Sequence, residues 1–125
     1  MSRHITILGM GPSAHQRAHD IERYIPAGSE IWGLNNGYLS FPTLRAGKKF
    51  ARMFELHVWD YLATWEPGTD PLTGRPANHF ACLEQLGCEV VTGQHIPIVR
   101  NQKQIDWEEV FGAFGPLVYF LGSPS

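Results

Sequence analysis

Two side chains that can move a proton stand close together near the middle of the chain. Glu55 and His57 are separated by one residue, so on a β-strand their side chains share one face. A carboxylate there can orient the imidazole or bind a ribose, and the imidazole can act as a general acid or base. Asp60 follows within reach. We predict that Glu55 and His57 are catalytic; ordinary polar residues at the end of a strand are the alternative.

A second set of residues is suited to binding an anion. Gly9-x-Gly11-x-x-Ala14 follows an apolar run and precedes a helical pattern, as in the turns that hold dinucleotide phosphates. In such turns the first glycine permits a sharp bend, the second lets the backbone approach a phosphate, and the third small residue permits close helix packing. We predict that Gly9, Gly11, Pro12, Ser13 and Ala14 form a phosphate-binding turn, with free amides and the Ser13 hydroxyl as donors. In the alternative, the glycines only turn the chain.

The residues after the second apolar run narrow the choice of ligand. Dinucleotide-binding proteins place Asp or Glu about 20 residues past the glycine-rich turn, where it binds the ribose hydroxyls. This chain carries Asn35 and Asn36 there, followed by Gly37. Asparagine can bind a sugar or a base, but the missing carboxylate disfavours NAD. We predict that Asn35 and Asn36 contact the ligand; a plain turn is the alternative.

The N-terminal quarter of the chain resembles two groups of nucleotide-binding proteins. Its Gly-x-Gly-Pro-Ser turn, followed by a strand ending in Asn, is similar to the start of bacterial sialyltransferases that use CMP-sugars and of pterin pyrophosphokinase-like Rossmann proteins. The resemblance covers Ile5 to Asn36 and implies that Gly11, Ser13 and Asn35 contact a nucleotide. Met10 stands where the sialyltransferases commonly have Asn, and their later catalytic His has no match here. The pattern also resembles uncharacterised Rossmann-like proteins of bacteriophages, which adds no mechanism.

Alternating strands and helices must position these residues. Apolar runs predict strands over residues 4–8, 30–34, 51–56, 89–92 and 117–121. Helical spacing predicts helices over 12–24, 79–86 and 106–114, with Asn78 and Asp106 as caps. Residues 65–76 hold three prolines and two glycines, which predicts an irregular excursion of the kind that covers ligands. We predict an α/β fold, a Rossmann-like three-layer sandwich around a mainly parallel, doubly wound sheet of about five strands.

Composition indicates one domain over residues 1–125. The chain is 43% hydrophobic and 18% charged, as is ordinary for a globular protein. It has no N-terminal signal pattern and no window near the roughly 20 apolar residues of a membrane span, so we expect a cytoplasmic protein without a membrane partner. A formal net charge of −2 disfavours nucleic acid as a partner. A local basic patch and a homo-oligomer stay open.

The last residues repeat the chemistry of the first turn. The predicted strand at 117–121 runs into Gly-Ser-Pro-Ser, much as the strand at 4–8 runs into Gly-Met-Gly-Pro-Ser. We therefore expect a C-terminally truncated fragment of a longer protein; a tail that does not continue as a helix is the alternative.

Other polar and aromatic residues carry weaker signals. The spacing of His57, His79 and His95 matches no metal pattern, and the two cysteines form no C-x-x-C pair, so we predict no metal site and no disulfide. The indoles of Trp59, Trp65 and Trp107 can stack on a base, but are more typical of a core. We predict that Arg100 and Lys103 lie in a solvated polar loop.

These residues together predict a protein that binds a nucleotide or another phosphate-bearing small ligand at the first strand-to-helix turn. The cofactor is unknown beyond the nucleotide class, and whether a reaction follows binding stays open. Group transfer from a nucleotide-activated donor fits better than hydride transfer. Two alternatives remain: a non-catalytic binding or assembly protein that uses residues 65–76 as a contact surface, and an NAD(P)-dependent oxidoreductase.

Overall fold

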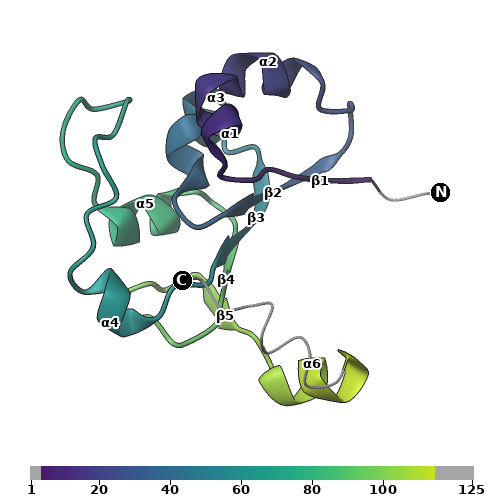
Figure 1. The fold of residues 1–125 in the computed structure, drawn as a ribbon, viewed down its shortest axis with the longest axis vertical. Helices are drawn as coiled ribbons and strands as arrows, with labels where there is room; N and C mark the ends of the chain where they lie inside the picture. Colours follow the sequence, from purple (N-terminus) through teal and green to yellow (C-terminus); the bar gives the residue numbers. More distant parts are fainter. Residues whose placement is uncertain (1–3, 115–125) are drawn as a thin grey trace.

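The structure is a computed structural model that describes residues 4–114. It contains a five-stranded, all-parallel sheet with helices between the strands (Figure 1). The strands are β1 (Ile5–Ile7), β2 (Glu30–Leu34), β3 (Phe50–Glu55), β4 (Glu89–Thr92) and β5 (Gln102–Gln104). The helices are α1 (Pro12–Gln16), α2 (Ala18–Arg23), the 3-10 helix η1 (Gly37–Ser40), α3 (Pro42–Ala46), α4 (Trp59–Leu62), α5 (His79–Gln85) and α6 (Trp107–Phe114). The prediction of a Rossmann-like α/β fold is confirmed.

The strands lie in the order β1-β2-β3-β4-β5, so each strand pairs with its neighbour in sequence. Within residues 4–114 this order has no reversal, whereas the predicted doubly wound sheet reverses its strand order at the crevice where ligands bind. Because all the strands are parallel, their C-terminal ends lie along one side of the sheet, which we call the carboxyl edge. The loops that leave β1, β2 and β3 therefore meet there.

One face of the sheet packs against the helices. In β2, Ile31 and Gly33 are buried while Trp32 between them is half-buried. The core joins side chains from this face with others from the helices, namely Ile31, Phe50, Met53 and Val90 with Tyr38, Phe41, Leu62, Leu83 and Leu86. A Cβ on Gly33 would lie 2.5 Å from Met53 Cε, so a larger residue here would displace the buried Met53 side chain.

The opposite face of the sheet is more open. Ile7 is 71% exposed there, and the Trp32 ring packs against Phe54 with centroids 5.4 Å apart and under the Arg52 guanidinium. Figure 1 shows α6 extending beyond β5, away from α4 and α5. None of the helices within residues 4–114 has the length and apolar character needed to cross a bilayer.

Several element bounds differ from the sequence prediction. The helix predicted over 12–24 is divided into α1 and α2, because Arg17 leaves helical geometry at φ −119° and ψ 25°. The polar loop predicted around Lys103 is wrong, since residues 102–104 form β5 against β4. Both predicted helix caps are confirmed: Asn78 accepts a hydrogen bond from Ala81, and Asp106 accepts one from Glu109. The strand predicted over 117–121 and the predicted truncation lie outside the described residues.

The excursion at residues 65–76 is tied to α3. Arg45 donates two hydrogen bonds to the Asp70 carboxylate, at 2.6 and 2.9 Å, and the two side chains are only 9% and 5% exposed. Hydrogen bonding by Arg45 lowers the pKa of Asp70, and the carboxylate in turn raises the pKa of Arg45. A bridge between Thr69 and Pro76 closes the excursion on itself. Figure 1 shows it reaching out beside α5.

Candidate functional site

Four polar side chains form a continuous hydrogen-bonded chain at the carboxyl edge. Glu55, at the end of β3, is fully buried. Its Oε1 lies 2.8 Å from the His57 backbone nitrogen and 2.6 Å from His57 Nδ1. Its Oε2 lies 2.5 Å from His79 Nε2, and His79 Nδ1 lies 2.6 Å from Tyr38 Oη. We call Tyr38, His79, Glu55 and His57 the relay.

The parallel topology explains why these four residues meet. Tyr38 is in η1, which begins soon after β2 ends, and His57 follows the end of β3. His79 is the first residue of α5, which must run back from the carboxyl edge to the start of β4. The Asn78 cap fixes that starting point, because its side chain holds an amide of the first turn. Each residue therefore comes from a segment that begins or ends at the same edge.

Further polar groups extend the relay toward the excursion. Arg45 donates to Cys82 Sγ at 3.2 Å, and the Arg45 guanidinium lies over the Tyr38 ring. Burial raises the pKa of the Tyr38 hydroxyl far above its usual value and also raises the pKa of the Cys82 thiol. Both groups therefore keep their protons at neutral pH, and polar contacts run without interruption from Asp70 to His57.

Aromatic rings cover the end of the relay. The His57 ring stacks on Tyr61 at 4.8 Å and lies 5.0 Å from Trp65, and its side chain is 15% exposed. Trp65 also packs edge-on against His79. His57 Nε2 forms no hydrogen bond with any residue that the structure describes. The pair of Glu55 and His57 can thus hold a proton on one ring nitrogen and offer the other to a ligand.

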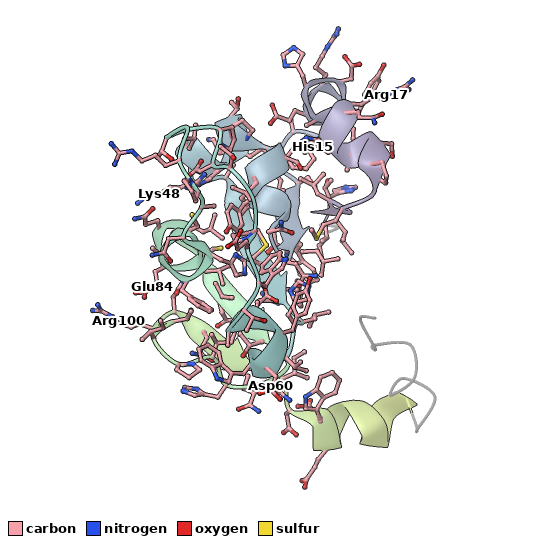
Figure 2. All side chains as sticks on the ribbon, turned by 60° about the vertical axis from the view of Figure 1, so that its left-hand side comes forward. His15, Arg17, Lys48, Asp60, Glu84 and Arg100 are labelled. Carbon is pink, nitrogen blue, oxygen red and sulfur yellow. The ribbon has the colours of Figure 1, made fainter. Side chains whose placement is uncertain are left out.

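Asp60 does not belong to this arrangement. It is exposed on α4 (Figure 2), and no hydrogen bond or ion pair joins it to Glu55 or His57 within residues 4–114. Nearness in sequence did not bring it into contact, because α4 carries its side chain outward.

A cleft with a volume of about 480 Å³ lies beside the first turn. It is bounded by the first turn, α1, the end of β2, η1 and the excursion, through Met10, His15, Asn36, Leu39, Ser40, Pro67, Gly68, Thr69 and Pro71. His15 Nδ1 lies 3.1 Å from Ser40 Oγ. Asn36 donates to the Pro67 carbonyl, while its Oδ1 has no partner among the described residues. We call this space the first-turn cleft.

Met10 is the one residue of the first turn in the lining of this cleft, and none of the five predicted turn residues is part of that lining. Gly9, Gly11, Pro12 and Ser13 are exposed, and Ala14 is buried. Neither Gly9 nor Gly11 has a positive φ. A Cβ on Gly9 would meet nothing within 4 Å, and one on Gly11 only Ser13 Oγ at 4.0 Å. Neither the backbone conformation nor the packing of the protein requires glycine at these two positions.

The two predicted asparagines are used differently. Asn35 adopts φ 51°, and its Oδ1 accepts a hydrogen bond from Leu56 N at 2.9 Å. Asn35 therefore joins the loop after β2 to the loop after β3, and only Asn36 lines the cleft. His57 does not line it either, but the excursion reaches both places, with Trp65 on the relay and Pro67 in the cleft.

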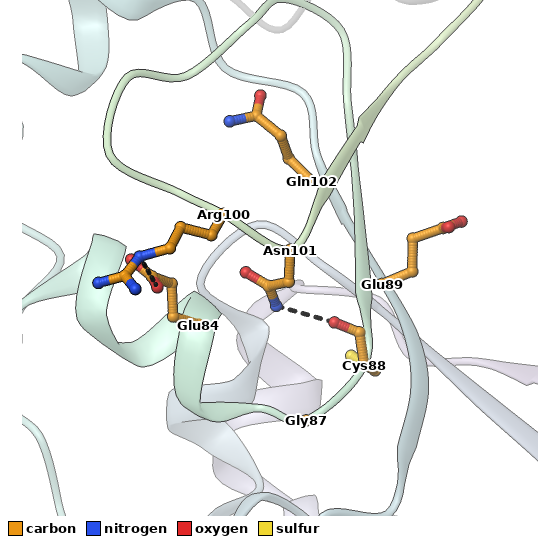
Figure 3. A pocket seen from close by; sticks show the side chains of 7 residues that line it. All are labelled: Glu84, Gly87, Cys88, Glu89, Arg100, Asn101 and Gln102. Atoms are coloured by element: carbon orange, nitrogen blue, oxygen red, sulfur yellow. Dashed lines mark hydrogen bonds and ion pairs between the residues drawn. The ribbon is translucent and has the colours of Figure 1, made fainter.

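A second cleft of about 480 Å³ lies near the start of β4 (Figure 3). Its lining comprises Glu84, Gly87, Cys88, Glu89, Arg100, Asn101 and Gln102. Asn101 donates to the carbonyls of Leu83 and Cys88, which ties α5 to β4, and the Arg100 side chain is 91% exposed. No residue that the sequence singles out for ligand binding is found there, and its polar contacts serve the fold.

Within residues 4–114 no group of three or more His, Cys, Asp or Glu side chains is arranged to hold a metal ion. Comparison of the chain with protein-family models, curated protein sequences and solved structures finds no match.

Sequence reasoning considered His79 only as a metal ligand and did not consider Tyr38. The signal that could have found both residues is the topology, because segments that begin or end next to the C-terminal ends of parallel strands meet at the carboxyl edge.

Proposed function

We propose that the chain binds a nucleotide or another phosphate-bearing small ligand in the first-turn cleft. The observation that carries the proposal is the open space at Gly9 and Gly11, where the fold itself does not need glycine. Glycine at such positions lets a ligand approach the backbone without meeting a Cβ. The alternative is that the glycines only turn the chain, and the two experiments below distinguish it from ligand binding.

Donors around the turn support an anionic ligand. The N–H groups of Gly9, Met10 and Gly11 donate to no other residue that the structure describes, and His15 and Ser40 add polar groups to the cleft lining. Because α1 has only five residues, its dipole adds little, and individual N–H groups must supply the attraction.

The relay supports a reaction on the bound ligand. His57, held by Glu55, is suited to take a proton from an attacking group during transfer from a nucleotide-activated donor. Since His57 lies outside the cleft lining, the reacting part of the ligand must extend along the carboxyl edge past Asn36. For a transfer activity, His57→Gln is expected to lower kcat by about 10²–10⁴-fold.

Thermal denaturation with candidate ligands tests the binding step. CMP, AMP, NAD, NADP and pyrophosphate are compared, since a ligand at 100 times its Kd adds about 2.7 kcal/mol to stability. A rise in Tm with CMP, AMP or pyrophosphate supports the proposal. A rise with NAD or NADP alone supports the oxidoreductase alternative, and no rise with any of them supports the assembly alternative.

Gly11→Val locates the site. The space around Gly11 accepts a side chain, so the variant is expected to fold, and its affinity for the ligand that shifts Tm is expected to fall at least about tenfold, or 1.4 kcal/mol. Gly112→Val is the matched control, because Gly112 is equally open but lies in α6, far from the cleft (Figure 1). Unchanged affinity in folded Gly11→Val would refute the proposed site.

A further inference from the structure

We propose that Tyr38 and His79 are positioning residues that act through Glu55 to fix His57 in one tautomer, with the proton on Nδ1 and a lone pair on Nε2. The inference rests on the proposed function only in that His57 is its acid-base group. It also defines what the site accepts: a ligand that presents an O–H or N–H group to Nε2.

The bonds at Glu55 Oε1 define the His57 tautomer. The His57 backbone N–H can only donate, and it meets the same oxygen as Nδ1. With Glu55 ionised, Oε1 can only accept, so Nδ1 carries the proton that lies between them at 2.6 Å. A neutral imidazole has only one ring proton, so Nε2 is left with its lone pair.

The proton positions on His79 and Tyr38 follow from the same reasoning. With Glu55 ionised, Oε2 accepts from His79 Nε2–H, and His79 Nδ1 must accept from the Tyr38 hydroxyl. The Cys82 sulfur accepts from Arg45. Every polar atom of the relay other than His57 Nε2 thereby has a partner.

The competing expectation is a relay in which the hydrogen bonds between Glu55, His79 and Tyr38 run in the opposite direction. If Glu55 carried a proton on Oε2, it would donate to His79 Nε2, His79 would donate from Nδ1 to Tyr38, and Tyr38 would donate to Cys82. The two patterns place the His79 proton on opposite nitrogens. The tautomer of His79 therefore tells them apart.

Long-range proton–nitrogen NMR of the ligand-free full chain at neutral pH reads the proton position on each histidine ring. We expect protons on Nδ1 of His57 and on Nε2 of His79. In Glu55→Gln the amide oxygen must face the two His57 donors, so the amide NH₂ faces His79. His79 is then expected to change to the Nδ1–H tautomer while His57 keeps its own. An Nδ1–H tautomer of His79 already present in the wild type would overturn the proposal.

A second pair of variants tests positioning itself. His79→Phe leaves Glu55 Oε2 without a partner. The carboxylate can then turn away from His57 Nδ1, so His57 is expected to change from one tautomer to a mixture. Phe80→Leu is the control, because Phe80 packs 6.1 Å from His79 by ring centroids and contributes no relay hydrogen bond; it should leave His57 unchanged. A single His57 tautomer in folded His79→Phe would refute a positioning role.

Tyr38→Phe keeps the test decisive if His79→Phe does not fold. It retains the ring and removes only the donor to His79 Nδ1. Because ionised Glu55 Oε2 still accepts from His79 Nε2–H, His79 is expected to keep that tautomer in the variant. An Nδ1–H tautomer of His79 in folded Tyr38→Phe would count against the proposal. These spectra need no ligand. The proposal on the tautomers and the proposal on ligand binding can therefore fail independently, and each failure is recognised by its own experiment.

Discussion

The ion pair between Arg45 and Asp70 offers the sharpest test of how the excursion is held. Asp70→Asn keeps the shape of the side chain and removes its charge. Because both side chains are nearly buried and joined by two hydrogen bonds, the change leaves the guanidinium in the interior without its counterion. The same substitution weakens the turn in which Asp70 accepts from Leu72 N.

Removing one member of a buried ion pair costs about 3–5 kcal/mol. One hydrogen bond to Arg45 can survive in the Asn variant, so we expect the lower end, about 3 kcal/mol. With a urea m-value of about 1.5 kcal/mol/M, the unfolding midpoint should fall by about 2 M. Unfolding is followed by circular dichroism at pH 7, and limited proteolysis should cut residues 65–76 faster in the variant.

The matched control is the ion pair between Arg100 and Glu84, which is 3.5 Å long with Arg100 91% exposed (Figure 3). Arg100→Met should change stability by less than about 0.5 kcal/mol, because solvent screens exposed pairs. A midpoint shift in Asp70→Asn no larger than in Arg100→Met would refute the reasoning that this buried pair secures the excursion.

Further predictions concern acid stability, thiol reactivity and helix capping. Arg45 lowers the pKa of Asp70. The contribution of the Asp70 carboxylate to the free energy of unfolding is therefore complete above about pH 4 and is lost as the pH falls further. The urea midpoints of the wild type and Asp70→Asn should converge below that pH. Burial raises the pKa of Cys88 to about 11, so about one thiol in 1,000 is ionised at pH 8. Disulfide-exchange reagents should therefore label Cys88 in the folded protein at least about 100-fold more slowly than in the urea-unfolded chain. Asn78→Ala should cost about 1 kcal/mol in urea unfolding; an unchanged midpoint would show that the Asn78 cap is dispensable.

Short-range signals in the sequence located many of the elements. The apolar runs at 30–34 and 89–92 predicted β2 and β4 with their observed bounds, because a buried parallel strand needs a continuous apolar segment. The Asn78 cap was equally predictable, since its bond to Ala81 spans a single helical turn. Glu55 and His57 were recognisable as a pair because strand geometry alone sets residues two apart on one face.

Other features have no local signal. β5 consists of three polar residues, and its strand conformation depends on pairing with β4 and on the Gln102 side chain, which binds the backbone of Ile96 and Val99. The break at Arg17 was equally unpredicted, because the apolar spacing continues through it. Neither feature follows from periodicity.

The sequence by itself determined the class of fold, the glycine-rich turn and the pairing of Glu55 with His57, since each depends on neighbours in the chain. Only the tertiary structure decided the strand order, the use of Asn35 as a tie between loops, and the meeting of Glu55 with His79, 24 residues away. The physical reason is that a buried carboxylate must find donors wherever the chain brings them. Parallel strands with long crossovers brought them from distant segments to one edge of the sheet.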